Sequence, residues 1–196
     1  MIEINNHTAI VDNDFTNHLA ECHLTDEQLV TTLNIMFSEL NLAAVMHPLV
    51  YDKELLADKA RVKLLFEKKV FAKAEFSDIF QGCSAKKLYY IQMVRNLYHV
   101  LTGENFPFNG EDVLTQWIRQ KSFGEVHSFA TCLLCGCGIF LSDDGDSKRI
   151  KQNLDRATAS KVEVYSRQEF MDKFRAEGET KFNRRDRQAL THSSST

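Results

Sequence analysis

The segment from Gly124 to Asp146 constrains the fold of this chain most strongly. It opens with Gly-Glu, continues through a short apolar segment, turns at Gly136 and Gly138, and then has the apolar run Gly138–Leu141 followed by three acidic residues. The spacing of the first apolar residues predicts a helix of about three turns, which Gly136 would end. The run from Gly138 to Leu141 predicts a short buried strand. Ligands bind at the carboxyl ends of strands in open α/β sheets, so acids placed there indicate a cation site.

The rest of the chain alternates short apolar strands with amphipathic helices. This alternation predicts an α/β fold, with a small parallel sheet between helical layers. Residues 49–121 contain no convincing strand, so they are expected to add extra helices in the middle of the chain. Strands are predicted at residues 8–12, 43–46, 138–141 and 162–165. Helices are predicted after Thr25 as cap, from Pro48 through Phe66, after Ser84 as cap to Gly103, around residues 113–118, and over residues 147–156. A last helix is predicted over residues 166–175, opened by a capping box between Ser166 and Glu169.

Composition indicates one domain. The chain has 196 residues, of which 43% are hydrophobic, and this is enough for one sizeable core. We expect residues 1–177 to form that domain and residues 178–196 to form a polar, frayed tail with a basic run. The net charge of −3 provides no general attraction to nucleic acid. No membrane span or signal peptide is recognisable, so a cytoplasmic protein is expected.

The five cysteines do not suggest a disulfide framework. Three of them, Cys132, Cys135 and Cys137, have a spacing similar to that of soft-metal ligands. A zinc site would need a fourth ligand and usually a compact knuckle, whereas these thiols lie on a helix that leads into a strand. We therefore interpret Cys132 and Cys135 as small buried hydrophobic residues.

Two motifs and their order resemble the PIN-domain nucleases. The sequence Gly124-Glu125-Val126-His127-Ser128 opens the predicted helix, Ser142-Asp143-Asp144 follows the predicted strand, and the first strand ends at Asp12. The resemblance implies a three-layer PIN-like domain that hydrolyses RNA phosphodiester bonds with Mg²⁺ or Mn²⁺, for which carboxylates are suitable ligands. It implies catalytic roles for Asp12, Glu125 and Asp144.

A fourth acid is expected on the helix after the second strand. Glu54, followed by Leu55, fits the family's order, whereas helical phase alone points Asp52 nearer the core face. We choose Glu54 on the resemblance.

The resemblance also suggests the surroundings of the metal. The predicted metal ligands are Asp12, Glu125 and Asp144, with Asp146 or Asp143 available for a second ion. Asp146 has an equally good interpretation as the cap of a helix that begins at Ser147. The residues predicted to bind substrate are Ser128, Ser142, Lys148 and Arg149. His127 is interpreted as a structural residue.

Two other functions remain open. The order Asp12-Asn13-Asp14-Phe15-Thr16 also resembles the opening motif of haloacid-dehalogenase-like phosphatases, in which Asp12 would be the nucleophile and Asp14 the acid/base. Ile150 stands where that family's later motif has an Asp, and Glu125 would have no role. A PIN-like module that binds RNA or protein without cleavage is the third interpretation. The expected partners are RNA and, by the resemblance, a regulatory antitoxin-like protein.

Overall fold

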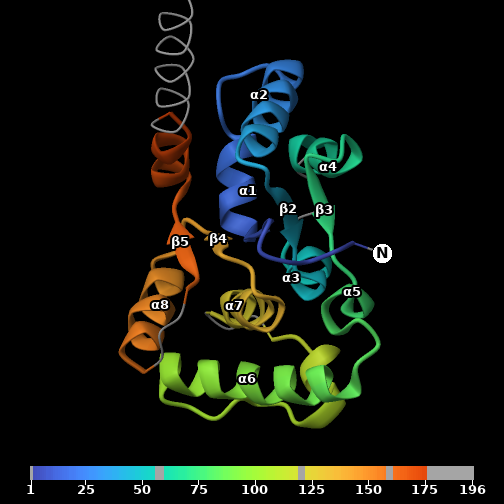
Figure 1. The fold of residues 1–196 in the computed structure, drawn as a ribbon, viewed down its shortest axis with the longest axis vertical. Coiled ribbons are helices and arrows are strands. Elements are labelled where there is room, and N and C mark those ends of the chain that lie inside the picture. The colour runs from blue at the N-terminus through green and yellow to red at the C-terminus, as the bar shows by residue number, and fades with distance from the viewer. Residues whose placement is uncertain (1, 56–59, 119–121, 158–160, 176–196) are drawn as a thin grey trace, which may run out of the picture.

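A computed structural model describes residues 2–55, 60–118, 122–157 and 161–175. A five-stranded parallel sheet with the strand order β3-β2-β1-β4-β5 forms its centre (Figure 1). The strands are β1 (Thr8–Val11), β2 (Ala43–Met46), β3 (Phe71–Lys73), β4 (Ile139–Leu141) and β5 (Glu163–Tyr165). The predicted α/β class, a parallel sheet between helical layers, is confirmed.

The helices connect and cover these strands. They are α1 (Asn13–Ala20), α2 (Asp26–Glu39), α3 (Pro48–Lys53), α4 (Ala60–Glu67), α5 (Phe76–Phe80), α6 (Ser84–Thr102), the 3₁₀ helix η1 (Gly110–Leu114), α7 (Phe123–Cys135) and α8 (Gly145–Ala157). Residues 167–175 are also helical. In the part of the chain that the structure describes, no helix is both long enough and apolar enough to cross a bilayer.

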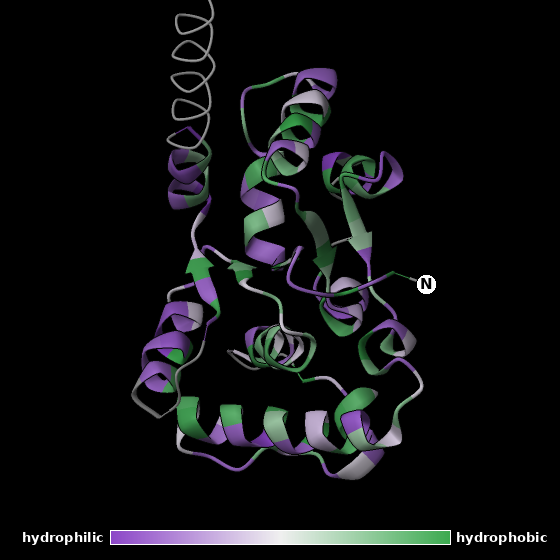
Figure 2. Cartoon of the chain, viewed as in Figure 1, coloured by the Kyte–Doolittle hydropathy of each residue, from purple (hydrophilic) through white to green (hydrophobic). Residues whose placement is uncertain are grey.

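Apolar cores pack on both faces of the sheet. In β1, Ile10 packs with the core that includes α6 and α7, whereas Ala9 and Val11 pack with the core that includes α1 and α2. All three side chains have 0% exposure. This explains why the strand sequences are continuously apolar, because alternate residues meet two different helical layers. Figure 2 shows the contrast between hydrophobic β2 and the largely hydrophilic α8.

Several predicted helix ends are confirmed. Thr25 caps α2 through a reciprocal capping box with Gln28. Gly136 ends α7 in a left-handed conformation with φ of 73°, which a residue without Cβ adopts at no steric cost. The predicted capping box before residues 167–175 is also present, since Glu169 accepts a hydrogen bond from the Ser166 amide at 2.8 Å. Cap and glycine residues therefore predict correctly where these helices begin or end.

Other predictions were wrong in the middle of the chain. The strand β3 lies within residues 49–121, where no strand was expected, and it pairs with β2 from Ala44↔Phe71 to Met46↔Lys73. The helix expected from Pro48 through Phe66 is two helices, because α3 ends at Lys53 and α4 begins at Ala60. Helix α1 was not predicted.

Two smaller corrections concern helix ends. Ser84 is the first residue of α6 rather than its cap, and Cys83 occupies the cap position. The helix expected around residues 113–118 is the 3₁₀ helix η1, which ends at Leu114. The predicted tail, residues 178–196, lies outside the described residues.

Candidate metal centre

Asp12 and Asp144 lie at the ends of neighbouring strands. The sheet order reverses between β1 and β4, and parallel pairing of Val11 with Leu141 places the residues that follow them side by side. The Asp12 amide donates to the Leu141 carbonyl at 2.9 Å. The Ser142 hydroxyl donates to Asp12 Oδ2 at 3.0 Å and accepts from the Asp144 amide at 3.1 Å. This point of reversal is where open α/β sheets form a ligand crevice.

The two aspartates use their side chains differently. Asp12 occupies the N-cap position of α1 but makes no side-chain capping hydrogen bond, so helix capping does not account for its buried carboxylate. Asp144 Oδ1 accepts from the Asp146 amide at 2.7 Å, at the start of α8. The helix begins at Gly145, one residue after Asp144, so the alternative in which Asp146 caps a helix from Ser147 was wrong.

Glu125 reaches the same region from helix α7. It lies in the first turn of α7, which packs on β1 and β4, and its residue exposure is 9%. Placement in the first turn is electrostatically favourable for a carboxylate because the helix dipole is positive there.

Glu54 approaches from the end of α3 and lies against Gly124. A Cβ atom on Gly124 would stand 2.6 Å from Glu54 Oε1, which is closer than real contacts allow. The absence of a side chain at Gly124 therefore lets the Glu54 carboxylate pack on the start of α7. This contact places Glu54 beside Glu125, the next residue along α7.

Burial and mutual repulsion raise the pKa values of these carboxyl groups. Burial first, then the charges of Asp14 and Asp144, raise the pKa of Asp12 to about 7. Burial and the charges of Asp12, Asp14 and Asp144 raise the pKa of Glu54 to about 8. Burial and the charges of Asp12, Glu54 and Asp144 raise the pKa of Glu125 to about 9. Residues from four separate segments thus form one electrostatically coupled group, which we call the carboxylate cluster: Asp12, Glu54, Glu125 and Asp144.

Asp14 lies near this cluster, because its charge raises the pKa of both Asp12 and Glu54. The nuclease interpretation did not include it, although the phosphatase alternative did. Its position two residues after Asp12, in the first turn of the unpredicted helix α1, was the available signal.

The donor chemistry of the cluster fits a hard divalent cation. All four groups offer carboxylate oxygens, which Mg²⁺ and Mn²⁺ prefer, and a cation would offset their mutual repulsion. The side chains are not arranged as a finished coordination sphere: in the part of the chain that the structure describes, no set of three or more His, Cys, Asp or Glu is placed to hold a metal ion. This holds equally for Cys132, Cys135 and Cys137. Ligation by the carboxylates therefore requires side-chain movement.

The competing acid Asp52 lies outside the cluster. It forms an ion pair with Lys73 on β3 at 2.9 Å, and its side chain is 47% exposed. The structure therefore brings Glu54, and not Asp52, together with the other predicted catalytic residues.

The acids suggested for a second ion already have protein partners. Asp146 accepts from the Ser122 hydroxyl at 2.5 Å and pairs with Arg149 at 3.1 Å. Asp143 pairs with His18 at 2.8 Å and accepts from the Arg167 amide at 2.8 Å. These contacts give both side chains a structural role in holding α8 and residues 167–175 near the sheet.

The residues predicted to bind substrate lie in different surroundings. Ser142 is buried and holds Asp12, as described above. Ser128 has 0% exposure, and its hydroxyl finds no hydrogen-bond partner among the described residues. Lys148 pairs with Glu169 at 2.8 Å, and Arg149 pairs with Asp146. The two cations remain partly exposed on α8, but both are already neutralised.

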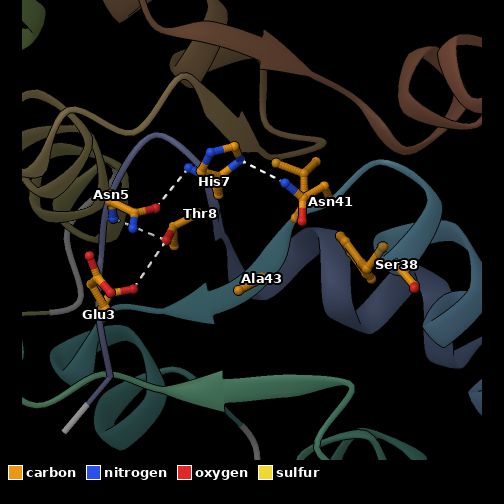
Figure 3. A pocket seen from close by; sticks show the side chains of 9 residues that line it. Glu3, Asn5, His7, Thr8, Ser38, Asn41 and Ala43 are labelled. Atoms are coloured by element: carbon orange, nitrogen blue, oxygen red, sulfur yellow. Dashed lines mark hydrogen bonds between the residues drawn. The ribbon is translucent and has the colours of Figure 1, made fainter.

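A separate polar hollow lies at the opposite edge of the sheet (Figure 3). Thr8 and Ala43, the first residues of β1 and β2, line it. Its polar groups largely satisfy one another: Asn41 Nδ2 lies 3.1 Å from His7 Nδ1, and the His7 amide donates to Asn5 at 2.8 Å. None of the predicted site residues lies there.

The fold and the cluster together define an α/β protein with buried and partly buried carboxylates at the carboxyl edge of a parallel sheet. Comparisons with models of known protein families, with curated proteins and with solved structures found no match.

Proposed function

We propose that this protein is a divalent-metal-dependent ribonuclease of the PIN-like type, which hydrolyses RNA phosphodiester bonds in the cytoplasm. The observation that carries the proposal is the carboxylate cluster. Burial and the charges of neighbouring acids raise the pKa values of Asp12, Glu54 and Glu125 in the folded chain. Perturbed carboxylates gathered at a sheet edge are typical of functional sites. The order of motifs that resembles the PIN family supports RNA as the substrate.

Each member of the cluster has a role that follows from its position. Asp12, Glu125 and Asp144 would hold Mg²⁺ or Mn²⁺, and Glu54, which packs on the start of α7, would orient the ion or a water. Ser142 keeps Asp12 at the strand end by donating to its carboxylate. When bound, such an ion lowers the pKa of water and neutralises phosphate charge.

Cleavage assays on a mixed set of RNAs and phosphomonoesters test this proposal. We expect RNA cleavage with Mn²⁺ or Mg²⁺, none in EDTA, and a loss on the order of 10²-fold or more for Glu125→Gln, since the amide keeps the shape but removes the charge. Circular dichroism should show that the variant is folded.

Two results would overturn the proposal. Hydrolysis of phosphomonoesters with RNA left intact, abolished by Asp14→Asn, would favour the phosphatase. RNA binding without hydrolysis, in a protein whose stability is indifferent to divalent ions, would favour a binding module. Asp144→Asn should abolish Mn²⁺ binding measured by calorimetry, which provides a readout independent of turnover.

A further inference from the structure

The hydroxyl of Tyr90 bridges two buried histidines. It lies 2.8 Å from His47 Nε2 and 2.9 Å from His127 Nδ1, and all three residues have 0% exposure. The rings also pack on one another, with His47 and His127 stacked at 5.2 Å between centroids. We call these three residues the His47–Tyr90–His127 bridge.

The donors in this bridge can be placed by counting hydrogens. Burial lowers the pKa of His47 well below its ordinary value, so its ring is neutral and carries one N–H. His47 Nδ1 accepts from the Leu49 amide at 3.2 Å, which places its proton on Nε2. That N–H donates to Tyr90, whose hydroxyl lies within hydrogen-bonding distance of both His127 Nδ1 and, at 3.4 Å, the His127 carbonyl oxygen.

The bridge connects the two helices that carry the glutamates of the cluster. His47 caps the start of α3, and Glu54 stands at the C-cap of the same helix. His127 lies on α7, two residues after Glu125. Tyr90 itself lies on α6, which covers α7 on the side away from the sheet (Figure 1).

Helix α3 depends on such contacts for its position. It has only six residues, and helices this short are not stable without tertiary packing. When Glu54 at its end and Glu125 on α7 are both ionised, their charges repel, so contacts between α3 and α7 must hold the two helices together in that form. A directional hydrogen bond in an apolar interior is suited to this task, because leaving either histidine unpaired is costly.

We propose that Tyr90 is a positioning residue: through the bridge it fixes α3 against α7 and thereby sets the separation of Glu54 and Glu125. This inference rests on the proposed function for its consequence, which is the affinity for the divalent ion. Tyr90 is not itself a member of the carboxylate cluster.

The test compares Tyr90→Phe with Tyr98→Phe. Both changes remove one hydroxyl from a buried tyrosine on α6, and Tyr98 packs against Phe106 and Phe123 instead of the histidines. Calorimetry with Mn²⁺ should show at least tenfold weaker binding at unchanged stoichiometry for Tyr90→Phe and wild-type affinity for Tyr98→Phe. Backbone amide NMR of the metal-free proteins should show shifts in both α3 and the first turns of α7 only for Tyr90→Phe.

A second variant covers the case in which Tyr90→Phe does not fold. His47→Asn keeps a side chain that can cap α3 but removes the bond to Tyr90, and it should give the same paired shifts and weaker binding. NMR changes confined to the immediate surroundings of the replaced residue, with Mn²⁺ affinity unchanged, would overturn the inference. If the wild-type protein binds no Mn²⁺, the proposed function fails, while the metal-free shifts still decide whether the bridge positions α3 and α7.

Discussion

At the scale of single residues, Gly124 shows how a missing side chain can serve a site. The Glu54 carboxylate occupies the space that a Cβ at this position would need. Its neighbour Glu125 supplies a charge, but Gly124 decides whether Glu54 can lie beside that charge. Within this Gly-Glu pair, Glu125 supplies its own carboxylate to the cluster, and Gly124 leaves the space that the Glu54 carboxylate occupies.

Gly124→Ala should therefore separate activity from stability. The atom in conflict is the end of a flexible side chain, so Glu54 should move aside, while the gain in helix propensity should stay below about 1 kcal/mol because Gly124 lies in the first turn of α7. We expect RNA cleavage to fall on the order of 10²-fold, because small misplacements of catalytic groups are costly. Thermal unfolding should stay within a few degrees of wild type. Gly138→Ala is the control, since nothing lies within 4 Å of its added Cβ, and it should cleave normally.

Glu54→Gln and Asp52→Asn form the second comparison. At saturating Mn²⁺, we expect RNA cleavage to be lost for Glu54→Gln and retained for Asp52→Asn. Asp52→Asn removes an exposed ion pair with Lys73, for which a stability loss below about 1 kcal/mol is expected. Loss of cleavage only in Asp52→Asn would contradict the assignment, and loss in neither variant would remove this segment from the site.

The reason that sequence could not choose between these two acids is local. Helical phase favours Asp52 only if one helix runs through both residues and on to Phe66. The structure ends α3 at Lys53 and gives Glu54 φ and ψ of −108° and −33°, so Glu54 departs from regular helical geometry. Asp12, Glu125 and Asp144 were easier to place, because each stands at a strand end or a helix start that the sequence itself marks.

At the scale of elements, the predictions succeeded where a helix or strand has clear signals at its ends, and they missed strand β3 and helix α1. The strand β3 has three residues and pairs only with β2, so packing in the fold rather than its own short sequence determines it. Helix α1 follows Asp12 directly, and the Asp12 side chain makes no capping hydrogen bond to it. In both cases tertiary packing decides the conformation, and a single sequence does not display that packing.

The segment from α7 to β4 gives a prediction about thiol chemistry. Cys132 and Cys137 are buried, and burial raises the pKa of Cys132 well above its ordinary value and that of Cys135 to about 12. Cys83, at the start of α6, is exposed. N-ethylmaleimide at pH 7.5 should therefore modify Cys83 first and should reach Cys132 and Cys137 only after unfolding, as peptide mass mapping would show.

A companion experiment tests the zinc alternative for the same thiols. The triple replacement Cys132→Ala, Cys135→Ala and Cys137→Ala should keep Mn²⁺-dependent cleavage while losing stability through lost packing. Stoichiometric zinc that disappears in this variant, or rapid labelling of Cys132 in the folded protein, would contradict the interpretation as buried apolar residues.

At the scale of the whole molecule, the reversal of strand order brings the cluster together. The chain leaves β1 toward β2 and β3 on one side and returns through α7 to β4 on the other. Residues more than a hundred positions apart, Asp12 and Ser142, meet because of this order. Apolar cores on both faces of the sheet make the arrangement rigid enough to hold like charges close to each other.

That proximity should make the stability of the metal-free protein depend on pH. The folded pKa values of Asp12, Glu54 and Glu125, about 7, 8 and 9, lie above those of unfolded carboxyl groups. At pH values between the unfolded and the folded pKa values, the folded state binds more protons than the unfolded state. The free energy of unfolding therefore falls as pH rises through this range. His47 and His127 have lowered pKa values and act in the opposite sense, but only near and below pH 6.5, where the unfolded rings take up protons.

Thermal unfolding between pH 7 and 8.5 therefore reports mainly on the carboxylates, and the buried thiols of Cys132 and Cys135 add a decrease of the same sign only toward the upper end of the range. In EDTA we expect the free energy of unfolding to fall by about 1 to 2 kcal/mol per pH unit, which lowers the melting temperature by roughly 2 to 4 °C for each kcal/mol. With 10 mM Mg²⁺ or Mn²⁺ the fall should be much smaller, because a bound cation stabilises the ionised carboxylates and only the folded state holds them together. Asp12→Asn with Glu125→Gln should flatten the pH dependence in EDTA and remove the response to the ion. A melting temperature in EDTA that is constant or rises over this range would show that these carboxyl groups are not held together as a repelling cluster.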